Sequence, residues 1–214
     1  MIKWLEDAVF YEVYPQSFRD SNGDGIGDIP GITEKLEYIQ ELGCNALWIN
    51  PCFTSPFYDA GYDVEDYYSV APRYGTNEDL KKLFEAAHQR GMHVLLDLVP
   101  GHTAVTHPWF QESMKAEKNE YTDRYVWTDS LYKRMEDVKG IVSVLRGISP
   151  RPASCGVNCF STQPALNYGF ANITDAGWQQ PTDAPGPMAT REELKNIMRF
   201  WLTLGCDGFR VDMA

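Results

Sequence analysis

The feature of this sequence that most constrains its fold is a unit that occurs three times: an amphipathic helix, a glycine at the helix end, and an almost wholly apolar strand. Apolar residues recur at helical spacing before Gly43, Gly91 and Gly205, and a short apolar run follows each glycine. Apolar strands that alternate with amphipathic helices predict a parallel sheet covered by helices. The predicted fold class is therefore α/β.

A strand over Val9–Tyr14 precedes these units, so the sequence predicts four parallel strands. A doubly wound nucleotide-binding sheet is disfavoured because no Gly-x-Gly-x-x-Gly pattern follows this first strand. Polar residues at the ends of the later strands favour a (β/α)8 TIM-barrel type, which keeps its sites there. A whole barrel takes about 250 residues, so we expect about the first four strands here. The expected later helices and strands are 32–42, 46–50, 76–90, 94–99, 190–204 and 206–212.

Two of the expected helices have a capping-box pattern at their start. Thr76 is followed three residues later by Asp79, and Thr190 is followed three residues later by Glu193. We therefore expect helices to begin at these two threonines.

A long segment separates the third strand from the last helix. Residues 102–189 are too many for an ordinary connection, and we interpret them as an inserted subdomain with a helix over 108–118 and a strand over 141–145. The barrel then consists of a first part, residues 1–101 with strands one to three, and a continuation, residues 190–214.

The charge of the chain disfavours two classes of partner. The net charge of −11 and a sequence pI of about 4.8 disfavour nucleic acid and anionic membrane surfaces. The N-terminus has no apolar signal region, and no run approaches the roughly 18 apolar residues of a membrane span, so we expect a cytoplasmic protein.

Five cysteines are expected as reduced thiols, with a loop disulfide between Cys155 and Cys159 as the alternative.

The stretch Asp20–Asp28 matches the first nine positions of a Ca²⁺ loop of the EF-hand type. Oxygen-bearing side chains stand at positions 1, 3, 5 and 9, and a backbone carbonyl is available at position 7. Position 12 is Gly31, where an EF-hand has a bidentate Glu, so we expect a Ca²⁺ loop on another fold. The alternative is a polar turn of Asx and Gly residues. The predicted structural Ca²⁺ ligands are Asp20, Asn22, Asp24, the Ile26 carbonyl and Asp28.

Arg210 and Asp212 end the last predicted strand. Residues two apart on a strand point to the same side, so the guanidinium and the carboxylate are expected to meet. An arginine beside a carboxylate favours its ionised form, which a nucleophile needs. A structural salt bridge is the alternative, and the pair alone does not distinguish the two.

Several motifs together resemble glycoside hydrolase family 13, the α-amylase family, and within it the α-glucosidase and oligo-1,6-glucosidase branch. The match runs through essentially the whole chain in the family's order and implies its N-terminal half. The segments that carry the resemblance are Asp20–Asp28, Gly61–Asp63, Asp97–Thr103, Gln163–Asn167 and Gly208–Asp212.

The resemblance implies a retaining mechanism. Asp212 would be the catalytic nucleophile, Arg210 would hold it ionised and oriented, and Asp97 would brace Arg210. The family's proton donor is a Glu at the end of the fifth barrel strand, which is not among the four strands predicted here. We therefore expect the chain by itself to be inactive and to self-associate through unpaired strand edges.

The resemblance also implies how the sugar is bound. Tyr62 would stack on the sugar next to the scissile bond, Asp63 would hydrogen-bond its hydroxyls, and His102 would bind its 6-hydroxyl. The chain departs from the family pattern at Gly101, where Asn is usual, and at Ala165, where the oligo-1,6-glucosidase branch usually has Asp. The first departure argues against the Ca²⁺ site that this Asn serves in many amylases, and the second leaves linkage preference open.

The implied function is α-glucoside hydrolysis on α-gluco-oligosaccharides. The alternatives are a transglycosidase, such as a trehalose- or sucrose-isomerising enzyme, and a non-catalytic relative that acts as an interaction or transport-accessory protein. A more remote alternative is a stand-alone Ca²⁺-binding module. The presence of all the predicted site residues favours an enzyme over the non-catalytic reading.

Overall fold

The computed structural model describes residues 2–133 and 143–213. Its main sheet has four parallel strands in the order β1-β2-β5-β8, formed by Phe10–Val13, Ala46–Ile49, His93–Leu98 and Gly208–Val211. Each strand lies beside the next one of the predicted series, which is the order of consecutive barrel strands. The predicted α/β class and the four parallel strands are confirmed.

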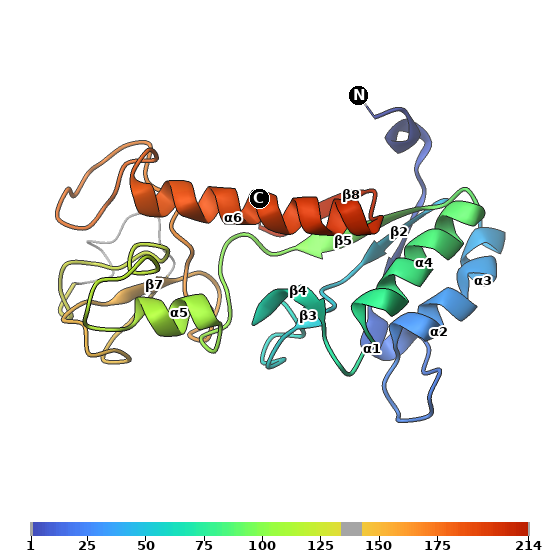
Figure 1. Cartoon of the computed structure of the whole chain (residues 1–214), viewed down its shortest axis with the longest axis horizontal. Helices are drawn as coiled ribbons and strands as arrows, with labels where there is room; N and C mark the ends of the chain where they lie inside the picture. The colour runs from blue at the N-terminus through green and yellow to red at the C-terminus, as the bar shows by residue number, and fades with distance from the viewer. Residues whose placement is uncertain (1, 134–142, 214) are drawn as a thin grey trace.

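Helices cover this sheet and extend away from it (Figure 1). Helix α4 has the predicted capping box, in which the Thr76 hydroxyl accepts from the Asp79 N–H and the Asp79 carboxylate accepts from the Thr76 N–H. The helical elements are η1 (Lys3–Asp7), α1 (Pro15–Phe18), α2 (Ile29–Glu34), α3 (Leu36–Glu41), α4 (Asn77–Gln89), α5 (Pro108–Ser113) and α6 (Pro185–Leu204).

The single helix predicted over 32–42 is wrong in two respects. It is divided into α2 and α3 at Lys35, and it begins earlier, because Asp28 acts as the N-cap of α2 and accepts a hydrogen bond from the Gly31 N–H at 2.6 Å. Pro30 stands in the first turn, where a proline fits without the loss of a helical hydrogen bond. The Asp–x–Pro sequence is therefore the start signal that the apolar periodicity missed.

The predicted start of the last helix at Thr190 is also wrong. Helix α6 begins at Pro185, and the Thr190 hydroxyl donates to the Gly186 carbonyl at 3.1 Å inside the helix. The prolines and the glycine in the first turn made this segment look like a loop, although prolines are tolerated there. The predicted boundary between subdomain and barrel at residues 189 and 190 therefore falls within a continuous helix.

The inserted segment contains little regular structure. Helix α5 is shorter than the predicted 108–118, and strands β6 (Ser143–Leu145) and β7 (Cys155–Val157) pair in antiparallel fashion. The first two residues of the predicted strand over 141–145 lie outside the described residues. A hairpin of β3 (Phe53–Thr54) and β4 (Asp66–Val70), which the sequence did not predict, stands between β2 and α4.

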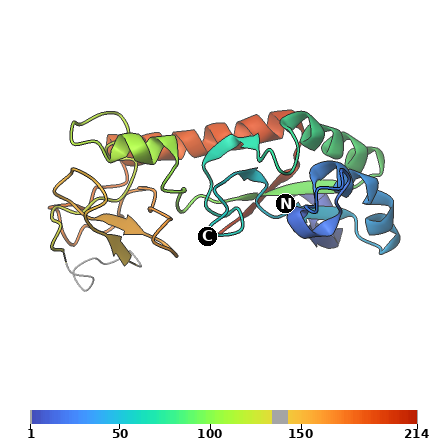
Figure 2. The same ribbon diagram turned by 90° about the horizontal axis from the view of Figure 1, so that it is seen from below.

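Helix α6 is the element that connects the two parts of the molecule. Figures 1 and 2 show it running from the inserted segment, which holds α5 and β7, to the sheet. At its C-terminal half, Trp201 is fully buried, stacks on Phe53 with ring centroids 5.1 Å apart, and donates its indole N–H to the Tyr67 carbonyl at 2.7 Å. This contact fixes the helix against the β3–β4 hairpin.

Among the described residues, no helix has the length and apolar character needed to cross a membrane. All five cysteines are free thiols, so the alternative of a Cys155–Cys159 disulfide is not adopted; Cys155 is buried and Cys159 is exposed.

Histidine 107 makes the stability of the fold depend on pH. Burial lowers its pKa to about 3, and its ring nitrogen Nδ1 accepts from the Trp109 N–H as the N-cap of α5. Below the ordinary histidine pKa of about 6.5, the unfolded chain binds a proton that the folded chain excludes. The stabilising contribution is therefore complete above that pH and decreases as the pH falls towards 3.

We expect His107→Asn to make the free energy of unfolding less dependent on pH between about 6 and 4, by roughly 1.4 kcal/mol per pH unit. Asparagine can still cap α5 through its side-chain oxygen. Urea unfolding at several pH values measures the effect. Equal slopes in His107→Asn and the unmodified chain would contradict the prediction.

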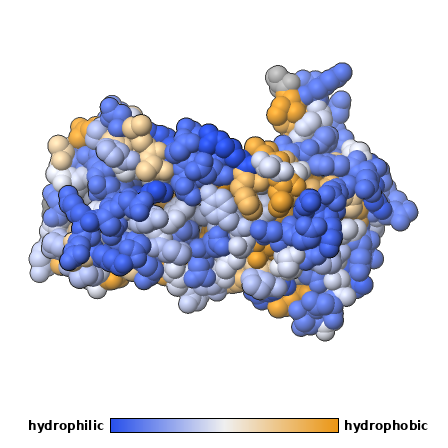
Figure 3. All heavy atoms as spheres, viewed as in Figure 1, coloured by the Kyte–Doolittle hydropathy of each residue, from blue (hydrophilic) through white to orange (hydrophobic). Residues whose placement is uncertain are grey.

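The outer strands β1 and β8 each have one strand neighbour in the described sheet. Phe10 on β1 and Val211 on β8 are 38% and 44% exposed, and Figure 3 shows apolar side chains gathered near the C-terminal end of α6. Exposed strand edges with apolar side chains favour association between chains.

We expect the chain to form oligomers as its concentration rises, and Phe10→Lys to weaken this association because a charge must then be buried at the strand edge. Sedimentation velocity over a concentration series measures it. Tyr132→Lys is the matched control, since this 88% exposed aromatic residue lies away from the sheet edge. A chain that stays monomeric at all concentrations would refute the expectation.

Candidate active site

The candidate active site lies at the carboxyl ends of β5 and β8, where parallel strands bring their polar residues together. Asp97 and Arg210 are register partners in these neighbouring strands. One residue beyond β8, the Asp212 N–H donates to the Leu98 carbonyl at 2.8 Å, which extends the pairing. The backbone therefore places the three charged residues in one row.

The Arg210 guanidinium joins the two carboxylates. Its Nη1 lies 2.7 Å from Asp212 Oδ1, and 3.1 and 3.2 Å from the two oxygens of Asp97. The Asp97 side chain is fully buried, whereas the Asp212 side chain is 14% exposed. The arrangement leaves Asp212 as the carboxylate that solvent, and hence a substrate, can reach.

Asp97 has two further partners. The Trp48 indole N–H donates to its Oδ2 at 2.9 Å, and the Tyr62 hydroxyl donates to the same oxygen at 3.1 Å. Burial raises the pKa of Asp97, and the hydrogen bonds from Trp48, Arg210 and Tyr62 oppose this shift. Asp97 contacts Arg210 directly, and its role in bracing this arginine stays a prediction.

Tyr62 is half-buried beside Asp97. Its hydroxyl also accepts a hydrogen bond from the Asn50 side-chain amide at 3.2 Å. Burial first, and then the charge of Asp97, raise the pKa of Tyr62 to about 12, so the phenol stays protonated at neutral pH. The two hydrogen bonds of the hydroxyl, to Asn50 and Asp97, hold the Tyr62 ring in one orientation at the edge of the site.

His102 is buried and contacts the backbone of Tyr62. It is 1% exposed, its Nε2 is 3.1 Å from the Tyr62 carbonyl, and its Nδ1 is 3.4 Å from the Asn158 amide nitrogen. A carbonyl partner requires a proton on Nε2, and an amide N–H partner requires Nδ1 to accept, which assigns the neutral tautomer. Burial lowers the pKa of His102, which also favours the neutral ring.

The structure does not support the predicted sugar contact by Asp63. This residue is fully buried, and its carboxylate accepts from the Ser55 hydroxyl and from the backbone N–H groups of Tyr58 and Asp59 at 2.8–3.1 Å. Its oxygens therefore hold the loop 55–59 in place. Asp59 on the same loop is half-buried, and its Oδ2 accepts from the Gln163 amide at 2.6 Å, whereas its Oδ1 has no hydrogen-bond partner among the described residues.

Besides Asp59, three polar residues of the site were missed in the sequence. Trp48 and Asn50 stand at the carboxyl end of β2, the same sheet edge that identified Asp97, so their position was a usable signal. The Arg210 guanidinium also lies 4.7 Å from the centre of the Trp48 ring, a cation–π geometry. Asn158 comes from the inserted segment, and the sequence carries no signal that it meets His102.

The loop Asp20–Asp28 is closed by its own hydrogen bonds. Asp20 accepts from the backbone N–H groups of three loop residues, and Asp24 accepts from the Ile26 N–H. Asp28 is directed to the α2 N-terminus and to Ser21. In the described residues no group of three or more His, Cys, Asp or Glu side chains is spaced to hold a metal ion. The fit to Ca²⁺ therefore rests on the alternation of oxygen atoms, and it remains a prediction.

Comparison with known proteins gives a family match. The model of a family described as alpha amylase, catalytic domain, matches residues 12–214. Among curated proteins, an oligo-1,6-glucosidase of Bacillus sp. (strain F5) is 38% identical over 213 residues, which cover 100% of this chain and 39% of that protein. The trehalose synthase/amylase TreS of Mycolicibacterium smegmatis is 43% identical over 215 residues, 98% of this chain and 33% of that protein.

Solved structures that resemble the chain include enzymes that act on sugars. An alpha-glucosyl transfer enzyme, XgtA, superposes with a TM-score of 0.80 at 39% identity, over 97% of this chain and 36% of that one. The trehalulose synthase MutB gives a TM-score of 0.79 at 38% identity, over 97% of this chain and 35% of that one. The chain thus spans between a third and two fifths of the length of these relatives.

The hydrogen bond from Trp48 to Asp97 can be tested without an activity assay. We expect Trp48→Phe to lower the free energy of unfolding by about 1.5–3 kcal/mol, the usual worth of a hydrogen bond to a charged group, because the buried carboxylate loses a donor. Urea unfolding measures this loss.

The control is Trp109→Phe. Trp109 is also half-buried, but its indole N–H makes no hydrogen bond among the described residues, so this variant reports the smaller loss of ring area alone. Equal destabilisation by the two variants would mean that the Trp48 hydrogen bond contributes nothing measurable.

Proposed function

Because the match over residues 12–214 shows that the chain belongs to the alpha-amylase catalytic-domain family, we propose that the protein is a retaining α-glucoside hydrolase that acts on α-linked gluco-oligosaccharides. The relatives named oligo-1,6-glucosidase support the substrate class. The chain spans about a third of the length of these relatives. The proposed activity is therefore that of the protein as a whole, and this chain supplies part of its active site.

The contact between Arg210 and Asp212 is the observation that carries this proposal. A retaining glycosidase needs one ionised carboxylate to attack the anomeric carbon and a second, protonated carboxyl to assist the leaving group, roughly 5–5.5 Å apart. Asp212 has the partner, the partial exposure and the position at a strand end that the attacking group requires. The second carboxyl would come from a later strand of the family barrel.

Tyr62 and His102 are proposed to bind the sugar next to the scissile bond. The half-buried Tyr62 ring, held through Asn50 and Asp97, offers a rigid face for stacking. His102 supports the Tyr62 backbone, and direct contact with a sugar hydroxyl would require one of its ring nitrogens to exchange a protein partner for the ligand. We assign the loop carboxylate that reaches the sugar to Asp59 and not to the buried Asp63.

Transfer to another sugar is a second candidate function. Relatives named trehalose synthase/amylase, trehalulose synthase and alpha-glucosyl transfer enzyme are as similar to the chain as those named glucosidase. Hydrolysis and transfer share the glucosyl-enzyme formed on Asp212 and differ in the acceptor. The non-catalytic alternative is weakened because the Asp97–Arg210–Asp212 row is present with hydrogen-bonding geometry.

The nucleophile assignment predicts that Asp212→Ala in the full-length protein lowers kcat on an aryl α-glucoside by several powers of ten. Azide, which can occupy the space of the lost carboxylate, is expected to restore turnover and to yield a glucosyl azide of inverted configuration. Asp183→Asn, an exposed aspartate of the inserted segment, is the matched control. Activity within tenfold of the unmodified protein would place the nucleophile elsewhere.

We further propose that Ca²⁺ stiffens the loop Asp20–Asp28, with the side chains of Asp20, Asn22 and Asp24 and the Ile26 carbonyl as ligands. The alternating oxygen atoms support this, and Asp28 would have to share its carboxylate with the α2 cap. Calorimetric titration of Ca²⁺ is expected to give heat that Asp24→Asn reduces. No heat, together with a melting temperature that chelation leaves unchanged, would refute the proposal.

We also propose that the protein is located in the cytoplasm. The free state of all five cysteines supports a reducing compartment.

A further inference from the structure

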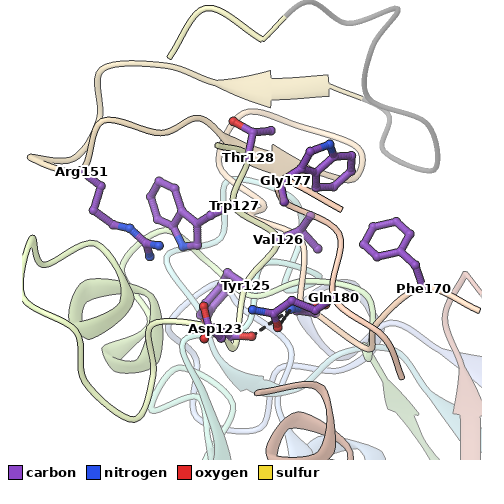
Figure 4. Close-up of a pocket in the computed structure, with 11 residues that line it drawn as sticks. Asp123, Tyr125, Val126, Trp127, Thr128, Arg151, Phe170, Gly177 and Gln180 are labelled. Atoms are coloured by element: carbon purple, nitrogen blue, oxygen red, sulfur yellow. Dashed lines mark hydrogen bonds between the residues drawn. The ribbon is translucent and has the colours of Figure 1, made fainter. Parts of the chain in front are cut away.

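A pocket lies in the inserted segment, away from the Asp97–Arg210–Asp212 row. It has a volume of 160 Å³ and is formed by the strand-like stretch 123–128, by Arg151 and by the segment 167–180 (Figure 4). Typical pockets for drug-sized ligands have roughly 300–1,000 Å³. This pocket therefore suits a molecule no larger than a single sugar ring.

The charges that line the pocket balance each other. Arg151 and Asp123 both line it, and among the described residues they interact through their charges without a direct salt bridge. The Arg151 guanidinium lies 4.3 Å from the centre of the Trp127 ring, and its Nη1 donates to the carbonyls of Ser113 and Thr122. An anion would be opposed by Asp123 and a cation by Arg151, so the pocket favours a neutral ligand.

The polar groups of the pocket keep unused hydrogen-bonding capacity. In the described part of the chain, the Asp123 carboxylate accepts no hydrogen bond, and the Gln180 side chain uses its oxygen for Asn167 while its amide N–H groups have no partner. Arg151 Nη2 is also without a partner there. Acceptors and donors on both sides of a small space match a molecule whose hydroxyl groups donate and accept.

Aromatic rings complete the lining. Tyr125, Trp127, Phe170 and Trp178 all contribute to the pocket wall, and Phe170 and Trp178 pack edge to face with centroids 5.2 Å apart. These rings pack among their neighbours, so the surface that faces the pocket is almost wholly polar, which suits a ligand rich in hydroxyl groups. A hydrocarbon ligand would leave the Asp123 carboxylate and the Gln180 amide unpaired.

We propose that this pocket is a second carbohydrate site that binds one neutral monosaccharide unit, with Asp123, Arg151 and Gln180 holding its hydroxyl groups. The site is distinct from the one at the ends of β5 and β8. The choice of a sugar as the ligand rests on the proposed function. Binding at this pocket can be measured in a chain in which Asp212 is replaced, so the two proposals can fail separately.

The test is saturation-transfer NMR with methyl α-D-glucopyranoside as the probe, which also works on associated chains. We expect transfer to the sugar in an Asp212→Asn, Tyr62→Phe chain, in which the first site is impaired. Adding Asp123→Asn is expected to weaken binding about fivefold or more, the effect of losing roughly one hydrogen bond of about 1 kcal/mol. Asp183→Asn, the same change on an exposed residue, is expected to leave binding unchanged.

Gln180→Glu provides a second variant that keeps the oxygen atom that accepts from Asn167 but removes the amide N–H donors, and it is expected to weaken binding as well. Far-UV circular dichroism confirms that each variant folds. Three results would overturn the proposal: no transfer to the sugar, which would mean that the pocket holds water only; transfer that disappears with the Asp212 and Tyr62 changes; or binding that neither Asp123→Asn nor Gln180→Glu weakens.

Discussion

Arg210 holds the carboxylates of Asp97 and Asp212 with a single nitrogen, at 3.1–3.2 Å and 2.7 Å. A fully buried carboxylate such as Asp97 is costly unless it is paired and hydrogen-bonded, and here Arg210, Trp48 and Tyr62 supply the donors. The pairing fixes the register of β5 against β8, because the three groups meet only when Asp97 lies opposite Arg210. It also determines the direction in which Asp212 points.

The same contacts tie the sheet to the loops around it. Trp48 comes from β2, Tyr62 from the connection between β3 and β4, and Arg210 from β8, so one buried carboxylate organises three parts of the chain. The shared acceptor makes these groups interdependent. A change in Trp48 or Tyr62 therefore alters the partners that remain for Asp97, and through Arg210 the orientation of Asp212.

The inserted segment reaches the site through a few specific contacts. The Tyr168 hydroxyl donates to the Pro100 carbonyl at 2.5 Å, Asn158 contacts His102 and the Gly101 carbonyl, and Gln163 donates to Asp59. Asn158 is of interest because the amide nitrogen lies 2.6 Å from where a Cβ on residue 101 would stand. Gly101 therefore makes room for an asparagine side chain that comes from another part of the chain.

The sequence by itself determined the elements that local patterns encode. Apolar periodicity with terminal glycines located the helices and parallel strands, and alternation along the last strand placed Arg210 beside Asp212. Helix starts at Ile29 and Pro185 were missed because prolines in a first turn look like breakers in a one-dimensional pattern. Only the tertiary structure decided that Asp63 is buried and that Trp48 holds Asp97, since burial and hydrogen-bond partners depend on segments that are distant in sequence and close in space.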